Sequence, residues 1–149
     1  MRKELEEKLY EIAPQFLAEY KCDPTWSCMA YDGIACGDGW FEPLKRFCET
    51  VEAMINDSPN RDIVAKQIKT KFGEMTVYWS IEDKNEPFMD RIAVEDADME
   101  HLMSEAVRNL VAECRMTCEL CGSTENVLEE HRLHICKKCK ENRTEGGRR

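Results

Sequence analysis

The sequence predicts an α+β fold, in which a small domain of helices and strands carries a C-terminal zinc-ribbon or treble-clef-like module. Two amphipathic helical patterns, one alternating strand pattern and two C-x-x-C pairs near the C-terminus indicate this arrangement. A chain of 149 residues with 42% hydrophobic residues suits one compact domain with a small appendage. We expect an acidic α+β domain over residues 1–115, a zinc module over 116–141 and a disordered basic tail over 142–149.

The N-terminal part combines one helical pattern with a segment of turns. Apolar residues recur at helical spacing over residues 3–20, and Pro14 should kink or divide this helix. The stretch 21–39 is rich in glycine and contains Pro24. We expect turns there around a short strand over 28–31, with a partner at 34–36.

The middle of the chain holds the strongest periodic patterns. The best amphipathic helix covers residues 40–55, with Asp38 as its expected N-cap. Residues 62–70 fit a short helix or a strand, whereas residues 74–81 alternate apolar and polar side chains as a half-buried strand does. A second strong helix should run from about Asp96 to Arg115, directly into the cysteine pairs.

The two cysteine pairs carry the clearest chemical signal. Fourteen residues separate Cys118-x-x-Cys121 from Cys136-x-x-Cys139. Each pair places two sulfurs on one tight turn, and this spacing is typical of a four-thiolate zinc site. Because four protein ligands leave no open coordination position, we expect Zn²⁺ to have a structural role. The module is too small to fold on apolar burial alone, so the ion would supply its folding energy.

Other metal ligands stay open as alternatives. Between the pairs, residues 127–128 and 133–135 could form a hairpin, and His131 or His134 could replace a cysteine. Cys114 could act as a spare ligand. A looser set matches no zinc spacing and is expected to be free thiols, with a second metal site as the alternative: Cys22, Cys28, Cys36 and Cys48.

The net charge of −9 is distributed unevenly. Residues 131–149 contain seven Lys/Arg and two Glu, a net charge of +5, which leaves −14 on residues 1–130. The acidic body could meet a basic protein partner. No aromatic residue follows Trp79 except Phe88, so we expect no base stacking near the basic tip. The tip could contact phosphates through four side chains: Lys137, Lys138, Lys140 and Arg143.

Several classes of protein lack support in the sequence. No apolar run approaches the ~18 residues that span a bilayer, and the charged N-terminus has no apolar region typical of a secretory signal. Nine cysteines then suit metal ligands and free thiols in a reducing cytoplasm. Some treble-clef nucleases carry a catalytic histidine. This chain, however, contains no glycine-rich phosphate loop or hydrolase motif, and we expect no catalytic activity.

The order of three motifs resembles a family of small phage, prophage and bacterial proteins. The resemblance covers most of residues 34–139, and implies a phage-associated accessory protein without implying an activity. The motifs are Cys36-Gly-Asp-Gly-Trp-Phe41, Gln67-Ile-Lys-Thr-Lys-Phe-Gly73 with Val77-Tyr-Trp79 after it, and Cys118-Glu-Leu-Cys-Gly122.

Physical interpretations of these motif residues are also possible. Gly37 and Gly39 flank a helix start, whose free amides could bind an anion. The alternative is that Asp38 simply caps the helix and Trp40 anchors it in the core. If a partner or ligand surface exists here, it should include Asp38, Trp40, Lys66, Lys69 and Lys71.

Together these patterns predict a non-catalytic, zinc-stabilised accessory protein that binds another macromolecule. An inhibitor of a host defence system is the working hypothesis, with an acidic face that occupies a basic surface of its target. One alternative is a nucleic-acid-binding regulator that uses the basic tip. The other is a nucleotide binder or sequesterer that uses the region of Gly37–Trp40.

Overall fold

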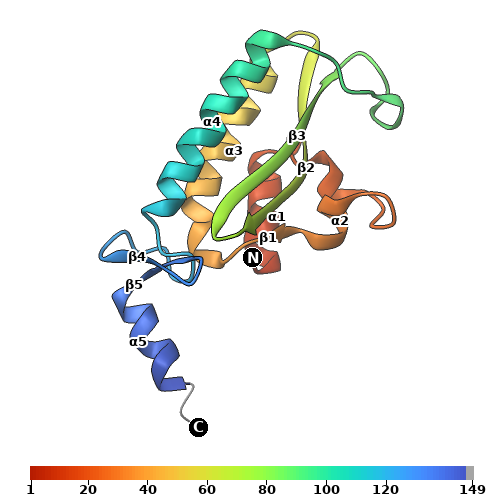
Figure 1. Cartoon of the computed structure of the whole chain (residues 1–149). Coiled ribbons are helices and arrows are strands. Elements are labelled where there is room, and N and C mark those ends of the chain that lie inside the picture. Colours follow the sequence, from red (N-terminus) through yellow and green to blue (C-terminus); the bar gives the residue numbers. More distant parts are fainter. Residues whose placement is uncertain (147–149) are drawn as a thin grey trace.

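Two long helices lie side by side along one face of a β-hairpin in the computed structural model, which describes residues 1–146 (Figure 1). The helices are α3 (Phe41–Asp57) and α4 (Ala97–Arg115), and the hairpin strands are β2 (Arg61–Lys71) and β3 (Glu74–Asp83). The predicted α+β class is confirmed, with five α-helices and two small sheets in the described residues.

The larger sheet has the order β1-β2-β3, and β1 (Ile34–Ala35) is parallel to β2. In the antiparallel β2–β3 pair, Ile68 is opposite Val77, and both side chains are buried. Because neighbouring strand residues point to opposite faces, Gln67 and its partner Tyr78 lie on the outer face. Residues 62–70, for which the sequence allowed either a short helix or a strand, therefore belong to strand β2.

The N-terminal segment confirms one prediction and corrects another. Helix α1 (Lys3–Ile12) ends before Pro14, as expected. After a 3-10 turn at Ala18–Lys21, residues Cys28–Asp32 form helix α2, so the strand predicted there is wrong. The Ser27 side chain caps α2 by accepting a backbone hydrogen bond, and the helix ends at a glycine with positive φ.

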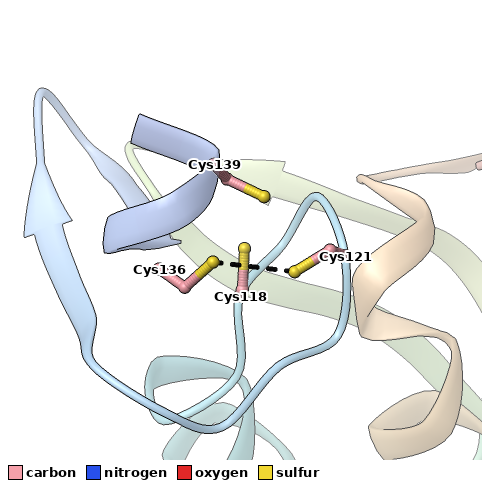
Figure 2. Close-up of side chains that lie close together, drawn as sticks. All are labelled: Cys118, Cys121, Cys136 and Cys139. Atoms are coloured by element: carbon pink, nitrogen blue, oxygen red, sulfur yellow. Dashed lines mark hydrogen bonds between the residues drawn. The ribbon is translucent and has the colours of Figure 1, made fainter. Parts of the chain in front are cut away.

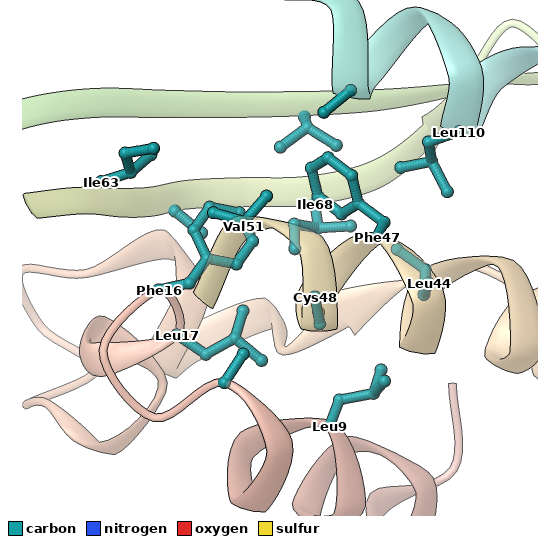
Figure 3. Packing of buried hydrophobic residues seen from close by; sticks show 14 of the residues in the cluster. Leu9, Phe16, Leu17, Leu44, Phe47, Cys48, Val51, Ile63, Ile68 and Leu110 are labelled. Atoms are coloured by element: carbon teal, nitrogen blue, oxygen red, sulfur yellow. The ribbon is translucent and has the colours of Figure 1, made fainter. Parts of the chain in front are cut away.

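One hydrophobic core joins these elements (Figure 3). The rings of Phe16 and Phe47 meet edge to face, with their centroids 5.6 Å apart. Glu52 of α3 is also buried, and its carboxylate accepts hydrogen bonds from the backbone amides of Gln15 and Phe16. This carboxylate satisfies amides that the break at Pro14 leaves without helical partners.

The second half of the chain contains the predicted long helix and the predicted hairpin. A 3-10 turn at Phe88–Asp90 leads to α4, where the Asp96 side chain caps the helix. The C-terminal module then contains β4 (Val127–Glu130), β5 (Leu133–Cys136) and α5 (Lys137–Gly146), which confirms the expected hairpin.

The expected tail over 142–149 is partly contradicted, because residues 142–146 continue α5. Lys137 and Glu141 lie one turn apart and within 4.0 Å, and the intervening Lys138 and Lys140 favour a helix. Residues 147–149 lie outside the described residues. Figure 1 shows α5 extending away from the body. In residues 1–146, no helix has both the length and the apolar composition that a membrane crossing requires.

Candidate metal centre

Four cysteine sulfurs converge in the C-terminal module (Figure 2). All four Sγ atoms lie within 4.8 Å of one another, and those of Cys121 and Cys136 are 3.7 Å apart. A tetrahedral ion with four bonds of ~2.3 Å needs sulfur separations of about 3.8 Å. The cluster can therefore hold a metal ion, and it contains the residues that the sequence predicted: Cys118, Cys121, Cys136 and Cys139.

The cysteines come from three elements that the fold brings together. Cys118 and Cys121 lie on the loop after α4, Cys136 ends β5, and Cys139 is in the first turn of α5. The first pair forms a tight turn, in which Gly122 has a φ of +79° and donates its N–H to the Cys118 carbonyl. Glycine favours this left-handed conformation, which explains its position directly after the second sulfur.

The surroundings of Cys118 favour its thiolate. Burial alone would raise the pKa of this thiol. The backbone amides of Cys136, Cys121 and Leu120 donate hydrogen bonds to the sulfur and bring its pKa down to about 7. Metals bind the thiolate, so these amide hydrogen bonds favour the form of Cys118 that would coordinate an ion.

The alternative ligands lie outside the cluster. His131 is exposed on the β4–β5 turn, and the buried His134 packs beside Trp40. Cys114 belongs to the main hydrophobic core. In the part of the chain that the structure describes, no second group of three or more potential ligands is close enough to share an ion. The looser set therefore consists of free thiols: Cys22, Cys28, Cys36 and Cys48.

Glu119, inside the first cysteine pair, joins the module to the body. Its backbone carbonyl accepts a hydrogen bond from the Gly39 amide at 2.8 Å. Its buried carboxylate accepts hydrogen bonds from the Gly37 amide at 3.1 Å and from the Thr70 hydroxyl at 2.8 Å. The two amides that were expected to bind an external anion are therefore occupied by Glu119, one by its carboxylate and the other by its backbone carbonyl.

This contact explains why two glycines lie before α3. A Cβ atom on Gly37 would overlap the backbone of Glu119, and one on Gly39 would overlap the carbonyl of Cys118. The 3-10 turn Asp38–Trp40, which begins after Gly37 and contains Gly39, leads directly into α3. The Gly-Asp-Gly-Trp motif is thus the docking strip of the cysteine module, a role that the sequence analysis missed.

Trp40 and Asp38 are corrections to the predicted ligand surface. Trp40 is 0% exposed, and its Nε1–H donates to the Thr117 carbonyl at 2.9 Å. The Asp38 carboxylate makes no cap for α3 and accepts hydrogen bonds from the backbone and side chain of Arg2. These bonds hold the pKa of Asp38 below its ordinary value. Both residues therefore serve internal contacts.

Lys66 is also engaged within the protein. Its Nζ lies 2.5 Å from a carboxylate oxygen of Glu19 and 2.8 Å from one of Glu82. Burial opposes its charge, but the two carboxylates raise the pKa of Lys66 above its ordinary value. Of the predicted ligand surface, Lys69 and Lys71 alone remain available for a partner.

Lys69 and Lys71 lie beside aromatic rings that the sequence analysis did not place there. The Lys69 Nζ is 5.7 Å from the ring centroid of Tyr78, and the Lys71 Nζ is 5.9 Å from that of Phe72. The guanidinium of Arg132, from the β4–β5 turn, is 5.1 Å from the same Phe72 ring. The expectation of no base stacking concerned the α5 tip, and these rings lie instead beside the lysines of β2 and beside Arg132.

The predicted phosphate-contacting residues lie on α5, and two of them have acidic partners. Lys140 pairs with Glu130 at 2.9 Å, and Lys137 lies 4.0 Å from Glu141. Lys138 and Arg143 are exposed. The basic tip is thus partly neutralised by its own module.

No protein-family model, curated protein or solved structure matches this chain. The cysteine cluster, its docking contacts and the surface beside it are therefore the features that bear on function.

Proposed function

We propose that the four clustered cysteines bind a structural zinc ion in a treble-clef-like module. The order of cysteine turn, hairpin and helix supports this assignment, as does an all-thiolate ligand set, which suits Zn²⁺. The apolar cluster of the module is small, with Ile135 at its centre and Val127 and Leu133 beside it. A bound ion would supply folding energy that this cluster cannot.

We further propose a non-catalytic accessory protein of phage type that binds another macromolecule. The resemblance of its motifs favours this setting, with inhibition of a host defence system in the cytoplasm as one role. A four-thiolate site leaves no position for a substrate. The small-ligand alternative loses its best site, because the amides of Gly37 and Gly39 are bonded to Glu119.

The observation that carries this proposal is a surface where two hairpin turns meet. Gly73, in the β2–β3 turn, packs against the backbone of Arg132 in the β4–β5 turn. Exposed aromatic rings and cations gather there. An aromatic side chain so exposed contributes little to the core and suits recognition of a partner. We name this hairpin-tip surface by its residues: Lys69, Lys71, Phe72, Tyr78 and Arg132.

Capture from a bacterial lysate tests this function. The zinc-loaded, full-length protein would be immobilised beside two variants. The hairpin-tip variant combines Phe72→Asn and Arg132→Ala, and the control variant carries Tyr31→Ala alone. Tyr31 is exposed on α2, outside the hairpin-tip surface, and serves as the matched aromatic control. We expect the unchanged protein and the control to retain the same protein or nucleic acid, and the hairpin-tip variant to lose it. Identical retention by all three would contradict the proposal.

A further inference from the structure

We infer that the hairpin-tip surface binds single-stranded nucleic acid, with bases stacked on Phe72 and Tyr78 and phosphates near the cations. This inference rests on the proposed function, because it names the class of the macromolecular partner. It assigns nucleic-acid contact to the hairpin-tip surface and not to the α5 tip, because Lys140 and Lys137 of α5 lie beside carboxylates.

Phe72 occupies a backbone position that suits a different residue. It has a φ of +54° and Gly73 has a φ of +85°, so both residues of the connecting turn are left-handed. Asn-Gly is the favoured pair in such hairpin turns, and a bulky side chain is unusual there. The Phe72 side chain is also 70% exposed. Neither turn geometry nor core packing explains the ring, which is therefore available to a partner.

The outer face of the hairpin continues this surface. Lys69 and Lys71 are two residues apart on β2, so they share the outer face with Gln67 and its partner Tyr78. Tyr78 is 42% exposed. Two lysines on β2, with one exposed ring in the turn and another on β3, provide the combination that binds bases and backbone together.

The cations of this surface have no acidic partner among the described residues. In residues 1–146, ion pairs are formed by other basic residues, and by none of Lys69, Lys71 and Arg132. The acidic residue of the turn, Glu74, directs its carboxylate to Arg115 at 2.9 Å. Unpaired cations on a chain with a net charge of −9 indicate an anionic partner.

The geometry favours a single strand over a duplex. Exposed rings on a hairpin can stack only on bases whose faces are free, which a duplex does not offer. The lysine ammonium groups lie near the outer limit of a cation–π contact, so they can leave the rings for phosphates. Arg132 comes from the cysteine module, so metal binding holds one cation in place.

Fluorescence anisotropy of labelled oligonucleotides tests the inference with the zinc-loaded, full-length protein. The probes are oligo-dT and oligo-U of about 12 nucleotides, and a duplex of equal length. Phe72→Asn removes the ring and keeps the left-handed turn, while Tyr31→Ala is the aromatic control. Lys69→Ala with Lys71→Ala removes two cations. Lys3→Ala with Lys8→Ala, on α1, is the charge control. Thermal unfolding confirms that each variant is folded.

We expect the single-stranded probes to bind more tightly than the duplex. Comparing the affinities of oligo-dT and oligo-U shows whether the surface prefers DNA or RNA. Phe72→Asn should weaken binding by about fivefold or more, the fold-change of a lost base stack. The Lys69/Lys71 variant should reduce the slope of log affinity against log salt by about 1.4. Neither control should change affinity.

Failure of both oligonucleotides to bind, or equal affinity of Phe72→Asn and the unchanged protein, would overturn the inference. In the lysate experiment, a different outcome is that the unchanged protein captures a protein that the double variant Phe72→Asn/Arg132→Ala does not retain. The proposed macromolecule-binding function would then stand, with a protein as the partner. If nothing were captured either, both proposals would fall.

Discussion

Cys136 lies where β5 becomes α5, and its sulfur is one of the four that surround the candidate ion position. Cys136→Ser should reduce bound zinc from about one ion per chain to a small fraction, because three remaining thiolates leave the tetrahedron incomplete. Elemental analysis after gel filtration measures the ratio. Cys28→Ser, at an exposed thiol outside the cluster, is the control and should retain the ion. Equal zinc in both variants would contradict a four-cysteine site.

Thiol reactivity distinguishes the buried core cysteines from the exposed Cys28. Burial raises the pKa of Cys36 and of Cys48 to about 12, so at neutral pH both stay protonated and unreactive. We expect iodoacetamide to label the exposed Cys28 rapidly in the zinc-loaded protein and to leave Cys36 and Cys48 unlabelled, as measured by peptide mass spectrometry. Labelling of Cys48 at the rate of Cys28 would show that the core is not packed as described.

At the scale of elements, the contact between the cysteine turn and the start of α3 depends on one carboxylate. Glu119→Ala removes the acceptor used by Gly37 and Thr70, and should lower the free energy of unfolding by about 2 kcal/mol. Urea denaturation measures the change. Glu119→Gln keeps an oxygen acceptor and should cost less.

Glu129→Ala is the matched control for this change, because Glu129 is an exposed glutamate of the same module. It should alter stability by no more than about 0.5 kcal/mol. A loss from Glu129→Ala equal to that from Glu119→Ala would mean that the docking contact contributes nothing specific.

The long elements of the body that the sequence predicted correctly are those with repeating patterns. Helices α3 and α4 and strand β3 each repeat their apolar spacing several times, which outweighs local ambiguity. The five-residue helix α2 offers no such repeat, and its main local signal is the cap at Ser27. Asp38 was misassigned as a cap because its partner, Arg2, is 36 residues away.

In the candidate site too, features with a local sequence pattern were predictable, whereas contacts between distant residues were not. The cysteine cluster was predictable because each C-x-x-C pair is local, and paired C-x-x-C spacing is typical of metal sites. The docking of Glu119 on Gly37 joins residues 82 apart in the chain. The approach of Arg132 to Phe72 also depends on two turns that meet only in the folded protein. Such contacts have no signature in one sequence.

At the scale of the whole molecule, two apolar clusters differ greatly in size. The main core includes side chains from α1, α3, α4 and the larger sheet, whereas the module has a small cluster around Ile135. The hydrogen bonds from Trp40 and Gly39 to the module join the two. The body should therefore fold without the ion, while the module should not.

Metal removal tests this difference in stability. On chelation, we expect amide hydrogen exchange to accelerate throughout residues 116–141 and at Gly37–Trp40, because loss of the ion unfolds the module and frees its docking strip. Protection in α3, α4 and β2 should persist, since their core does not include the cysteine cluster. Added zinc should restore the protection, and Cys136→Ser should show the chelated pattern without a chelator. Loss of protection throughout the chain would mean that body and module fold as one unit, and unchanged exchange in residues 116–141 would mean that the ion is not needed there.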